Sequence, residues 1–122
     1  MPVHYDLYQL EDLSDNDKEF MKTVVEAFLT EIPPDLTSMH MAIDNDNHRM
    51  AYQFAHKMKP NLEMFGIDLI REISTMERWA DSGKPTTVIK PQLAKIDSMI
   101  SSAIREMRRD WKIKDENSVR SA

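Results

Sequence analysis

The sequence predicts an all-α protein, an antiparallel four-helix bundle with an additional N-terminal helix. Three observations lead to this fold class. The chain holds only two glycines in 122 residues, which is few for the tight turns of a sheet protein. Apolar residues recur at steps of three and four along most of the chain, as in helices with one buried face. No stretch alternates apolar and polar residues as a half-buried strand would.

The first predicted helix runs from about residue 14 to residue 32. Ser14 is the expected N-cap, and acidic residues follow in the first turn. Pro33 and Pro34 are expected to end this helix, because proline cannot donate the backbone hydrogen bond that a helix interior needs. A second predicted helix begins after them and ends at the polar run "DNDN", residues 44–47.

Three further helices complete the prediction. The third covers about residues 48–65, and Gly66 is expected to close it. The fourth covers about residues 67–80 and is followed by a short loop. The last carries apolar residues from Leu93 to Trp111. Isolated helices of this length are marginal in water, so each must bury its apolar stripe against the others.

A single domain is expected at this length. We divide the chain into an N-terminal lead-in (1–13), the helical bundle (14–112) and a flexible, polar C-terminal tail (113–122). The start of the chain lacks the cationic and apolar regions of a signal peptide. No run approaches the roughly 18 apolar residues of a membrane span. We therefore expect a cytoplasmic protein that does not associate with membranes.

The composition also limits the chemistry and the partners. The chain has no cysteine, which excludes disulfides and thiolate catalysis. Its net charge is −5 and no basic stripe runs through it, so we do not expect a nucleic-acid partner.

His56 is the candidate functional residue. The apolar stripe predicted for the third helix comprises Met50, Phe54, Met58, Leu62 and Phe65. Four of these residues, from Phe54 to Phe65, define the inward direction. At about 100° per residue, His56 falls roughly 165° from that direction and should stand in water. The same outer face is predicted to hold Arg49, Tyr52, Gln53, Pro60 and Glu63, with Lys59 near its edge.

The cations around His56 suggest a use for it. Lys59 lies one helical turn on, and Lys57 is adjacent in sequence. Positive neighbours favour the neutral, nucleophilic imidazole and attract an anion placed on it, and a phosphoryl group fits both conditions. A partner would contact the outer face together with the off-stripe methionines, which gives the predicted set Met41, Arg49, Tyr52, Gln53, Lys57, Pro60, Glu63 and Met64.

The stretch "AHKMKPNLEMFG", residues 55–66, resembles the signature of histidine-containing phosphotransfer (HPt) domains. Ala55, His56 and Lys59 match the pattern, Met58 stands in for its leucine, and Gly66 falls at its second glycine. Agreement in helix order and size extends over about residues 14–111. Pro60 departs from the pattern, because the family usually has a glycine there, and this departure bears on how closely a partner can approach.

The resemblance implies a phosphorelay carrier that is not itself an enzyme. His56 would accept a phosphoryl group from the aspartyl phosphate of one receiver domain and pass it to another, and Lys59 would neutralise phosphate charge. The family has no nucleotide or metal site of its own, and the receiver domain supplies Mg²⁺. The implied partners are response-regulator receiver domains and a hybrid sensor histidine kinase, and a monomer is expected.

Other interpretations remain open from the sequence. The bundle could bind a partner without phosphotransfer, and a histidine on a helix surface is commonly idle. The phosphotransfer region of a histidine kinase is disfavoured, because an acid is expected where Lys57 stands. A di-iron bundle needs Glu-x-x-His pairs, which the chain lacks, and no two histidines have zinc-ligand spacing.

Overall fold

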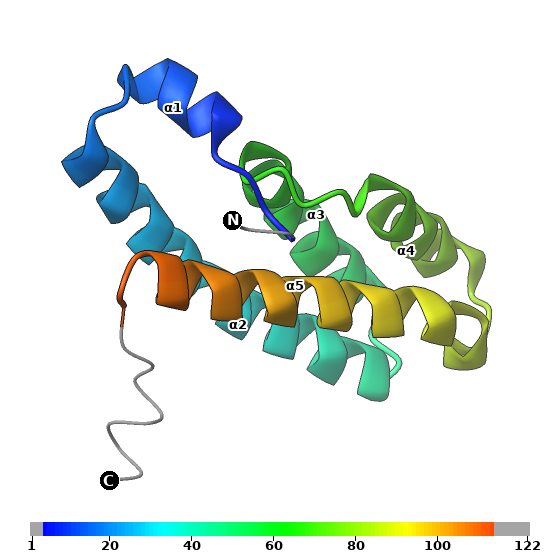
Figure 1. The fold of residues 1–122 in the computed structure, drawn as a ribbon. Helices are drawn as coiled ribbons and strands as arrows, with labels where there is room; N and C mark the ends of the chain where they lie inside the picture. The colour runs from blue at the N-terminus through cyan, green and yellow to red at the C-terminus, as the bar shows by residue number, and fades with distance from the viewer. Residues whose placement is uncertain (1–3, 114–122) are drawn as a thin grey trace, which may run out of the picture.

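The computed structural model describes residues 4–113, and every regular element in that range is helical (Figure 1). The elements, in chain order, are α1 (Tyr8–Ser14), α2 (Lys18–Asp44), α3 (His48–Met64), α4 (Ile70–Ser82), the short 3₁₀ helix η1 (Thr86–Ile89) and α5 (Lys90–Asp110). The all-α prediction is therefore confirmed for the described residues. None of these helices combines the length and the apolarity needed to cross a bilayer.

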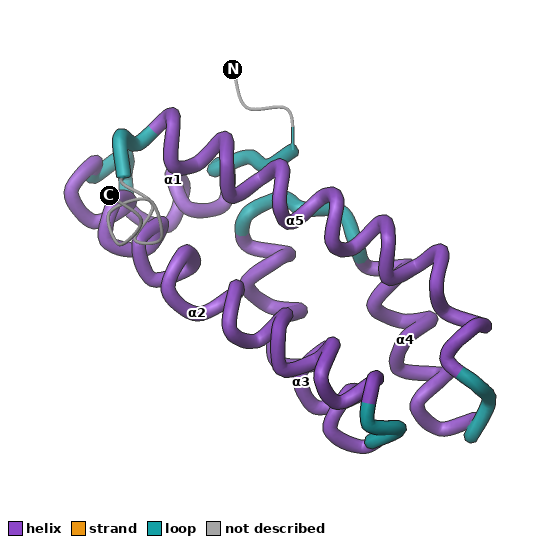
Figure 2. Tube along the Cα trace, turned by 90° about the horizontal axis from the view of Figure 1, so that it is seen from below, coloured by secondary structure: helices purple, strands orange, loops and turns teal. Residues whose placement is uncertain are grey.

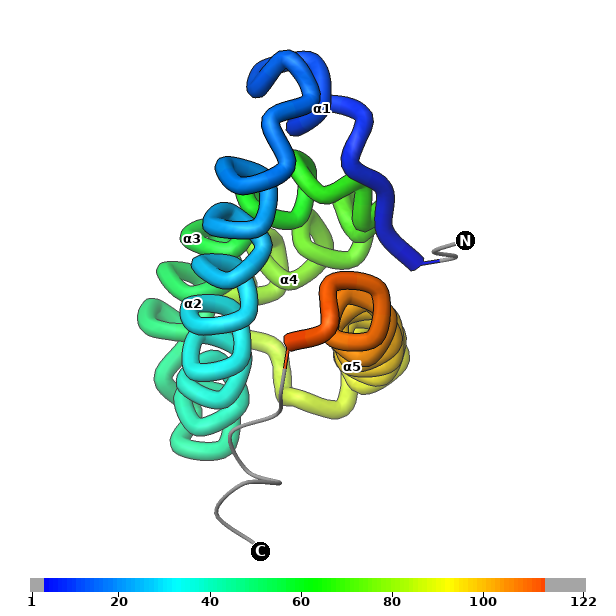
Figure 3. The backbone as a smooth tube through the Cα atoms, turned by 60° about the vertical axis from the view of Figure 1, so that its left-hand side comes forward, coloured from blue at the N-terminus to red at the C-terminus, as the bar shows by residue number. Residues whose placement is uncertain are grey.

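Consecutive long helices pack on one another. α2 contacts α3, α3 contacts α4, and α4 contacts α5. Figures 2 and 3 show α2 and α3 side by side, while α5 lies apart from α3. His40 of α2 approaches Asp97 of α5, with Nε2 and Oδ1 2.7 Å apart, so the last helix also meets the first long one. α3 is thus covered on two sides, by α2 and by α4, and exposes its remaining face.

The prediction that Pro33 and Pro34 end a helix is wrong, because both lie inside the continuous α2. The buried side chains Val25, Ile32 and Met39 lie on both sides of the prolines. An interior proline costs a helix about 3 kcal/mol. Full burial of one large aliphatic side chain contributes about 1.5–3 kcal/mol. Burial of the side chains on both sides of the two prolines therefore stabilises α2 by more than the prolines destabilise it.

The predicted start of the first long helix is also wrong. Ser14 is the last residue of α1, and Asp17 caps α2 by accepting hydrogen bonds from the backbone N–H groups of Glu19 and Phe20 at 3.1 and 3.2 Å. α1 lies largely within the segment expected as a lead-in, and it buries Leu10. A helix of seven residues with one buried side chain has too short an apolar pattern to be recognised from its period.

The apolar stripe of α3 differs from the prediction. The buried positions are Ala51, Ala55, Met58 and Leu62. Met50, predicted to be in the core, is 40% exposed, and Phe54 is only partly buried. Small side chains let neighbouring helices approach closely, so the buried face of α3 follows its alanines rather than its largest apolar residues. The rotation is small enough to leave His56 on the exposed side.

Gly66 ends α3 as predicted. Its N–H donates to the carbonyl of Glu63, and that of Ile67 donates to the carbonyl of Leu62, which is the pattern of a left-handed C-terminal cap. Gly66 has φ +64°, and a Cβ there would lie 2.2 Å from a carboxylate oxygen of Asp6. The Asp6 side chain therefore lies against this turn, where a residue with a Cβ would force it to shift. The Asp6 N–H donates to the carbonyl of Phe65 at 2.8 Å.

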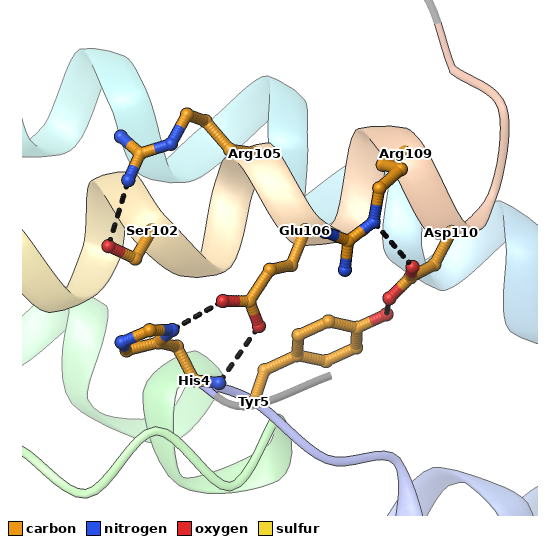
Figure 4. Close-up of polar contacts among 7 residues, drawn as sticks. All are labelled: His4, Tyr5, Ser102, Arg105, Glu106, Arg109 and Asp110. Carbon is orange, nitrogen blue, oxygen red and sulfur yellow. Dashed lines mark hydrogen bonds and ion pairs between the residues drawn. The ribbon is translucent and has the colours of Figure 1, made fainter. Parts of the chain in front are cut away.

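The N-terminal segment is also attached to α5 (Figure 4). The Glu106 carboxylate accepts the backbone N–H of His4 at 2.8 Å and contacts the His4 ring. The hydroxyl of the buried Tyr5 donates to Asp110 at 2.9 Å. Burial and the Asp110 carboxylate raise the pKa of Tyr5 above its ordinary value of 10.0. Residues 4–6 thus connect α5 to the end of α3.

The two glycines provide a matched test of the contact between Gly66 and Asp6. Gly83 has φ +68° and no atom within 4 Å of an added Cβ. Gly83→Ala should lower the free energy of unfolding by about 1 kcal/mol, the cost of a left-handed alanine. Gly66→Ala should cost about 2–4 kcal/mol, because the clash with Asp6 adds to the same strain. Urea denaturation measures both free energies of unfolding. The predicted clash would be contradicted if Gly66→Ala and Gly83→Ala cost the same, and if adding Asp6→Ala did not change the cost of Gly66→Ala.

The raised pKa of Tyr5 predicts a dependence of stability on pH. The folded state favours the neutral phenol, so this contribution is complete below about pH 10 and is lost as the pH rises toward the folded pKa. Tyr5→Phe should cost about 1 kcal/mol at neutral pH through the lost hydrogen bond. Its stability should then converge with that of wild type above about pH 10.

Urea denaturation across about pH 8–11 checks this convergence. Tyr8→Phe is the control, because Tyr8 is 76% exposed. A constant difference between wild type and Tyr5→Phe across that range would show that the Tyr5 pKa is not raised on folding.

Candidate functional site

His56 lies near the middle of α3 with 63% of its side chain exposed, in agreement with the predicted outward position. Two groups contact its ring. The Tyr52 ring, one turn earlier, lies nearly parallel to it with the centroids 5.8 Å apart and an interplanar angle of 5°. The Glu77 carboxylate of α4 approaches its Nδ1. The imidazole is therefore accessible to a partner while neighbouring side chains restrict its orientation.

Glu77 bridges the two residues that the sequence proposes as functional. Its Oε2 lies 3.1 Å from Nδ1 of His56, and its Oε1 lies 3.5 Å from Nζ of Lys59. The Glu77 side chain is only 16% exposed and that of Lys59 29%. The immediate surroundings of the imidazole thus contain one carboxylate and one ammonium, rather than the purely cationic surroundings that the sequence suggested.

Five of the predicted partner-binding residues lie on the exposed face of α3 around His56. All are exposed: Arg49, Tyr52, Gln53, Pro60 and Glu63. Arg49 precedes His56 by seven residues and Glu63 follows it by seven, so each lies about two turns away on the same face. Pro60 lies inside α3, which continues through it to Met64.

Lys57 does not join the site. Its Nζ lies 3.0 Å from Oδ1 of Asp35 on α2, on the other flank of α3. Among the described residues, Asp35 is the one charged residue that is buried. A buried carboxylate without a partner is strongly destabilising, so Lys57 has a structural role in this arrangement.

The predicted methionines lie apart from His56. Met41 is 59% exposed and lines a groove of about 240 Å³ between α2 and α3, together with Met50 and Phe54. On the helical wheel, Phe54 and His56 are about 160° apart, so this groove belongs to the α2 flank. Met64 is partly buried and packs against the core.

A larger groove lies next to Lys59. Its volume is about 460 Å³, and residues of α3, α4, the turn between them and α1 line it: Gln9, Lys59, Leu62, Glu63, Gly66, Ile67, Asp68, Leu69, Ile70 and Ile73. Ile70 is 49% exposed. The groove lies on the α4 flank, where Lys59 contacts Glu77. It therefore offers an uneven, partly apolar surface one turn beyond the exposed imidazole.

The remaining motif residues are structural. Ala55 and Met58 are fully buried and pack α3 against its neighbours, and Gly66 forms the turn described above. Among residues 4–113, no group of three or more histidine, aspartate or glutamate side chains is arranged to hold a metal ion.

A carboxylate partner alone does not distinguish His56. His4 contacts Glu106, and His40 contacts Asp97 through Nε2. The side chains of these two histidines are 39% and 35% exposed, against 63% for His56. His56 differs from both in its greater exposure, and its carboxylate partner also contacts Lys59.

Nothing in the sequence identified Glu77. It follows His56 by 21 residues on another helix, and the described part of α4 also carries Glu72 and Asp81. Selecting among these acids requires the phase of α4 relative to α3. The residue is found only once the two helices are packed.

Comparisons of the chain with models of protein families, with curated proteins and with solved structures give no match. Function is therefore inferred from the motif and from the geometry of the site.

Proposed function

We propose that this protein is a phosphorelay carrier of the HPt type, in which His56 takes a phosphoryl group from the aspartyl phosphate of one receiver domain and gives it to another. The observation that carries the proposal is the exposed imidazole of His56, with the Lys59 ammonium held beside it by a shared carboxylate. An accessible ring nitrogen supplies the nucleophile, and the nearby cation supplies compensation for phosphate charge.

The transfer itself requires little from the carrier. A nitrogen lone pair of His56 forms a bond to phosphorus while the bond from phosphorus to the aspartyl oxygen breaks, and that electron pair stays on the carboxylate of the receiver. Such a reaction depends mainly on positioning and charge stabilisation. The receiver brings Mg²⁺ and its acidic pocket, so the carrier needs no nucleotide or metal site and is not an enzyme in its own right.

The proposed architecture is an antiparallel four-helix bundle made of α2 to α5, with α1 as an additional N-terminal helix. In this arrangement α3 presents His56 from the middle of a rigid helix. The receiver would contact the exposed face of α3 and the groove beside Lys59, with Ile70 as an apolar contact. We further propose a cytoplasmic monomer whose partners are response-regulator receiver domains and a hybrid sensor histidine kinase.

The alternative is a helical bundle that only binds a partner. One observation favours it: the contacts of His56 and Lys59 with Glu77 join α3 to α4, so both residues could serve packing alone. Phosphorylation of His56 separates the two functions.

His56→Gln should abolish phosphorylation. Wild-type protein incubated with a receiver domain charged by acetyl phosphate should gain an acid-labile, alkali-stable phosphate, visible as a shifted band on a phosphate-binding gel. His40→Gln is the matched control, since His40 also contacts a carboxylate but is less exposed, and it should be phosphorylated like wild type. Label that persists in His56→Gln would assign the phosphate to another residue.

Lys59→Ala should slow phosphoryl transfer by roughly 10- to 150-fold, because one charge-assisted contact to phosphate contributes about 1.5–3 kcal/mol. The measurement is the transfer rate from the charged receiver under single-turnover conditions. Lys95→Ala is the control, because Lys95 forms an equivalent pair with Glu72 of α4 at 3.1 Å. Equal rates in Lys59→Ala and Lys95→Ala would remove the role assigned to Lys59.

A further inference from the structure

We propose that Glu77 is a positioning residue that fixes the tautomer of His56, with the proton on Nδ1 and the lone pair on Nε2. The consequence for phosphoryl transfer rests on the proposed function, whereas the contact between Glu77 and His56 does not depend on it. An ionised carboxylate can only accept a hydrogen bond, so a neutral imidazole at 3.1 Å from Oε2 must donate from Nδ1. Nε2 is then the nitrogen that remains unprotonated and able to attack phosphorus.

The surroundings hold this arrangement from two sides. Glu77 is largely shielded from water at 16% exposure, and its second oxygen is occupied by Lys59. On the other side, Tyr52 lies parallel to the imidazole at 5.8 Å. A stacked neighbour restricts rotation of the ring out of its plane, and the bond to Glu77 opposes the flip that would exchange the two nitrogens. The ring is thereby oriented before a partner arrives.

The same carboxylate suits the charge that develops during transfer. When Nε2 bonds to phosphorus and Nδ1 keeps its proton, the imidazole becomes cationic, and no proton has to leave. The Glu77 carboxylate then faces a positive ring, an interaction that strengthens as the bond forms. On the return step the Nε2–phosphorus bond breaks, its electrons return to the ring nitrogen, and the ring is again neutral with its proton on Nδ1.

Lys59 completes this arrangement. Its ammonium lies 3.5 Å from Oε1 of Glu77, at the outer limit of a hydrogen bond, so it is held beside the ring by a loose contact. A phosphoryl group carries nearly two negative charges and three acceptor oxygens, and competes effectively for this cation. Glu77 therefore links Lys59 to the same ring whose Nε2 would carry the phosphoryl group.

His40 provides an internal contrast. It contacts Asp97 through Nε2 at 2.7 Å. Because the carboxylate can only accept, the neutral ring of His40 should have the opposite tautomer, with the proton on Nε2. Nitrogen-15 NMR of the histidine rings distinguishes the two forms, at a pH where both rings are neutral. Wild-type protein should show the Nδ1–H form for His56 and the Nε2–H form for His40.

Substitutions at Glu77 test whether this residue sets the tautomer. Glu77→Ala should move His56 toward the Nε2–H form, and Glu77→Gln, whose amide oxygen can still accept from Nδ1, should restore the Nδ1–H form at least in part. Glu72→Ala is the matched control on the same helix, because Glu72 pairs with Lys95 instead, and it should leave His56 unchanged. An Nε2–H form of His56 in wild type, or an unchanged tautomer in Glu77→Ala, would overturn the inference.

Phosphorylation by a charged receiver, with the linked nitrogen identified by phosphorus–nitrogen coupling, separates this inference from the proposed function. Wild type should carry the phosphoryl group on Nε2, and Glu77→Ala should be phosphorylated more slowly. If wild type shows the Nδ1–H tautomer but takes no phosphoryl group, the proposed function is overturned. If Glu77→Ala is phosphorylated at the wild-type rate on Nε2, only the role of Glu77 is overturned.

Discussion

The close packing of α3 between α2 and α4 is the constraint on which the site depends. Ala51 and Ala55 are fully buried there, together with Met58. Because these side chains set the inner face of the helix, the rotation of α3 about its axis is fixed, and His56 falls about 130° from the centre of that face. The exposure of the imidazole is therefore a consequence of core packing. A different rotation would bury the ring or move it away from α4.

The two flanks of α3 divide the charged residues around His56. Lys57 turns toward α2 and compensates Asp35, whose carboxylate is buried. Lys59 turns toward α4, where its contact with Glu77 is longer, at 3.5 Å against 3.0 Å. Removing the partner of a buried charge is costly, so Lys57 is committed to the fold. Lys59 has the longer contact, and the proposed function assigns to it the role of the cation that meets an incoming anion.

These details explain which features the sequence could predict. The outward position of His56 and the turn at Gly66 follow from local signals, a helical period and a glycine after an apolar run, and both agree with the structure. The passage of α2 through Pro33 depends on burial along the whole helix, which a local signal cannot weigh. The contact with Glu77 depends on how two helices are rotated against each other. The third helix and the outward position of His56 were predictable, whereas the residues that contact His56 from other helices required the packed structure.

Pro60 is the departure from the family pattern that most directly affects the site, and the exposed face of α3 accounts for its tolerance. A proline at this position has no N–H for the carbonyl of His56, one turn earlier. Pro60 and His56 are both exposed, and α3 continues through the proline to Met64. The core face, with Met58 and Leu62, is unaffected. The proline therefore alters the exposed surface of α3, and it leaves His56, the Glu77 carboxylate and Lys59 in contact.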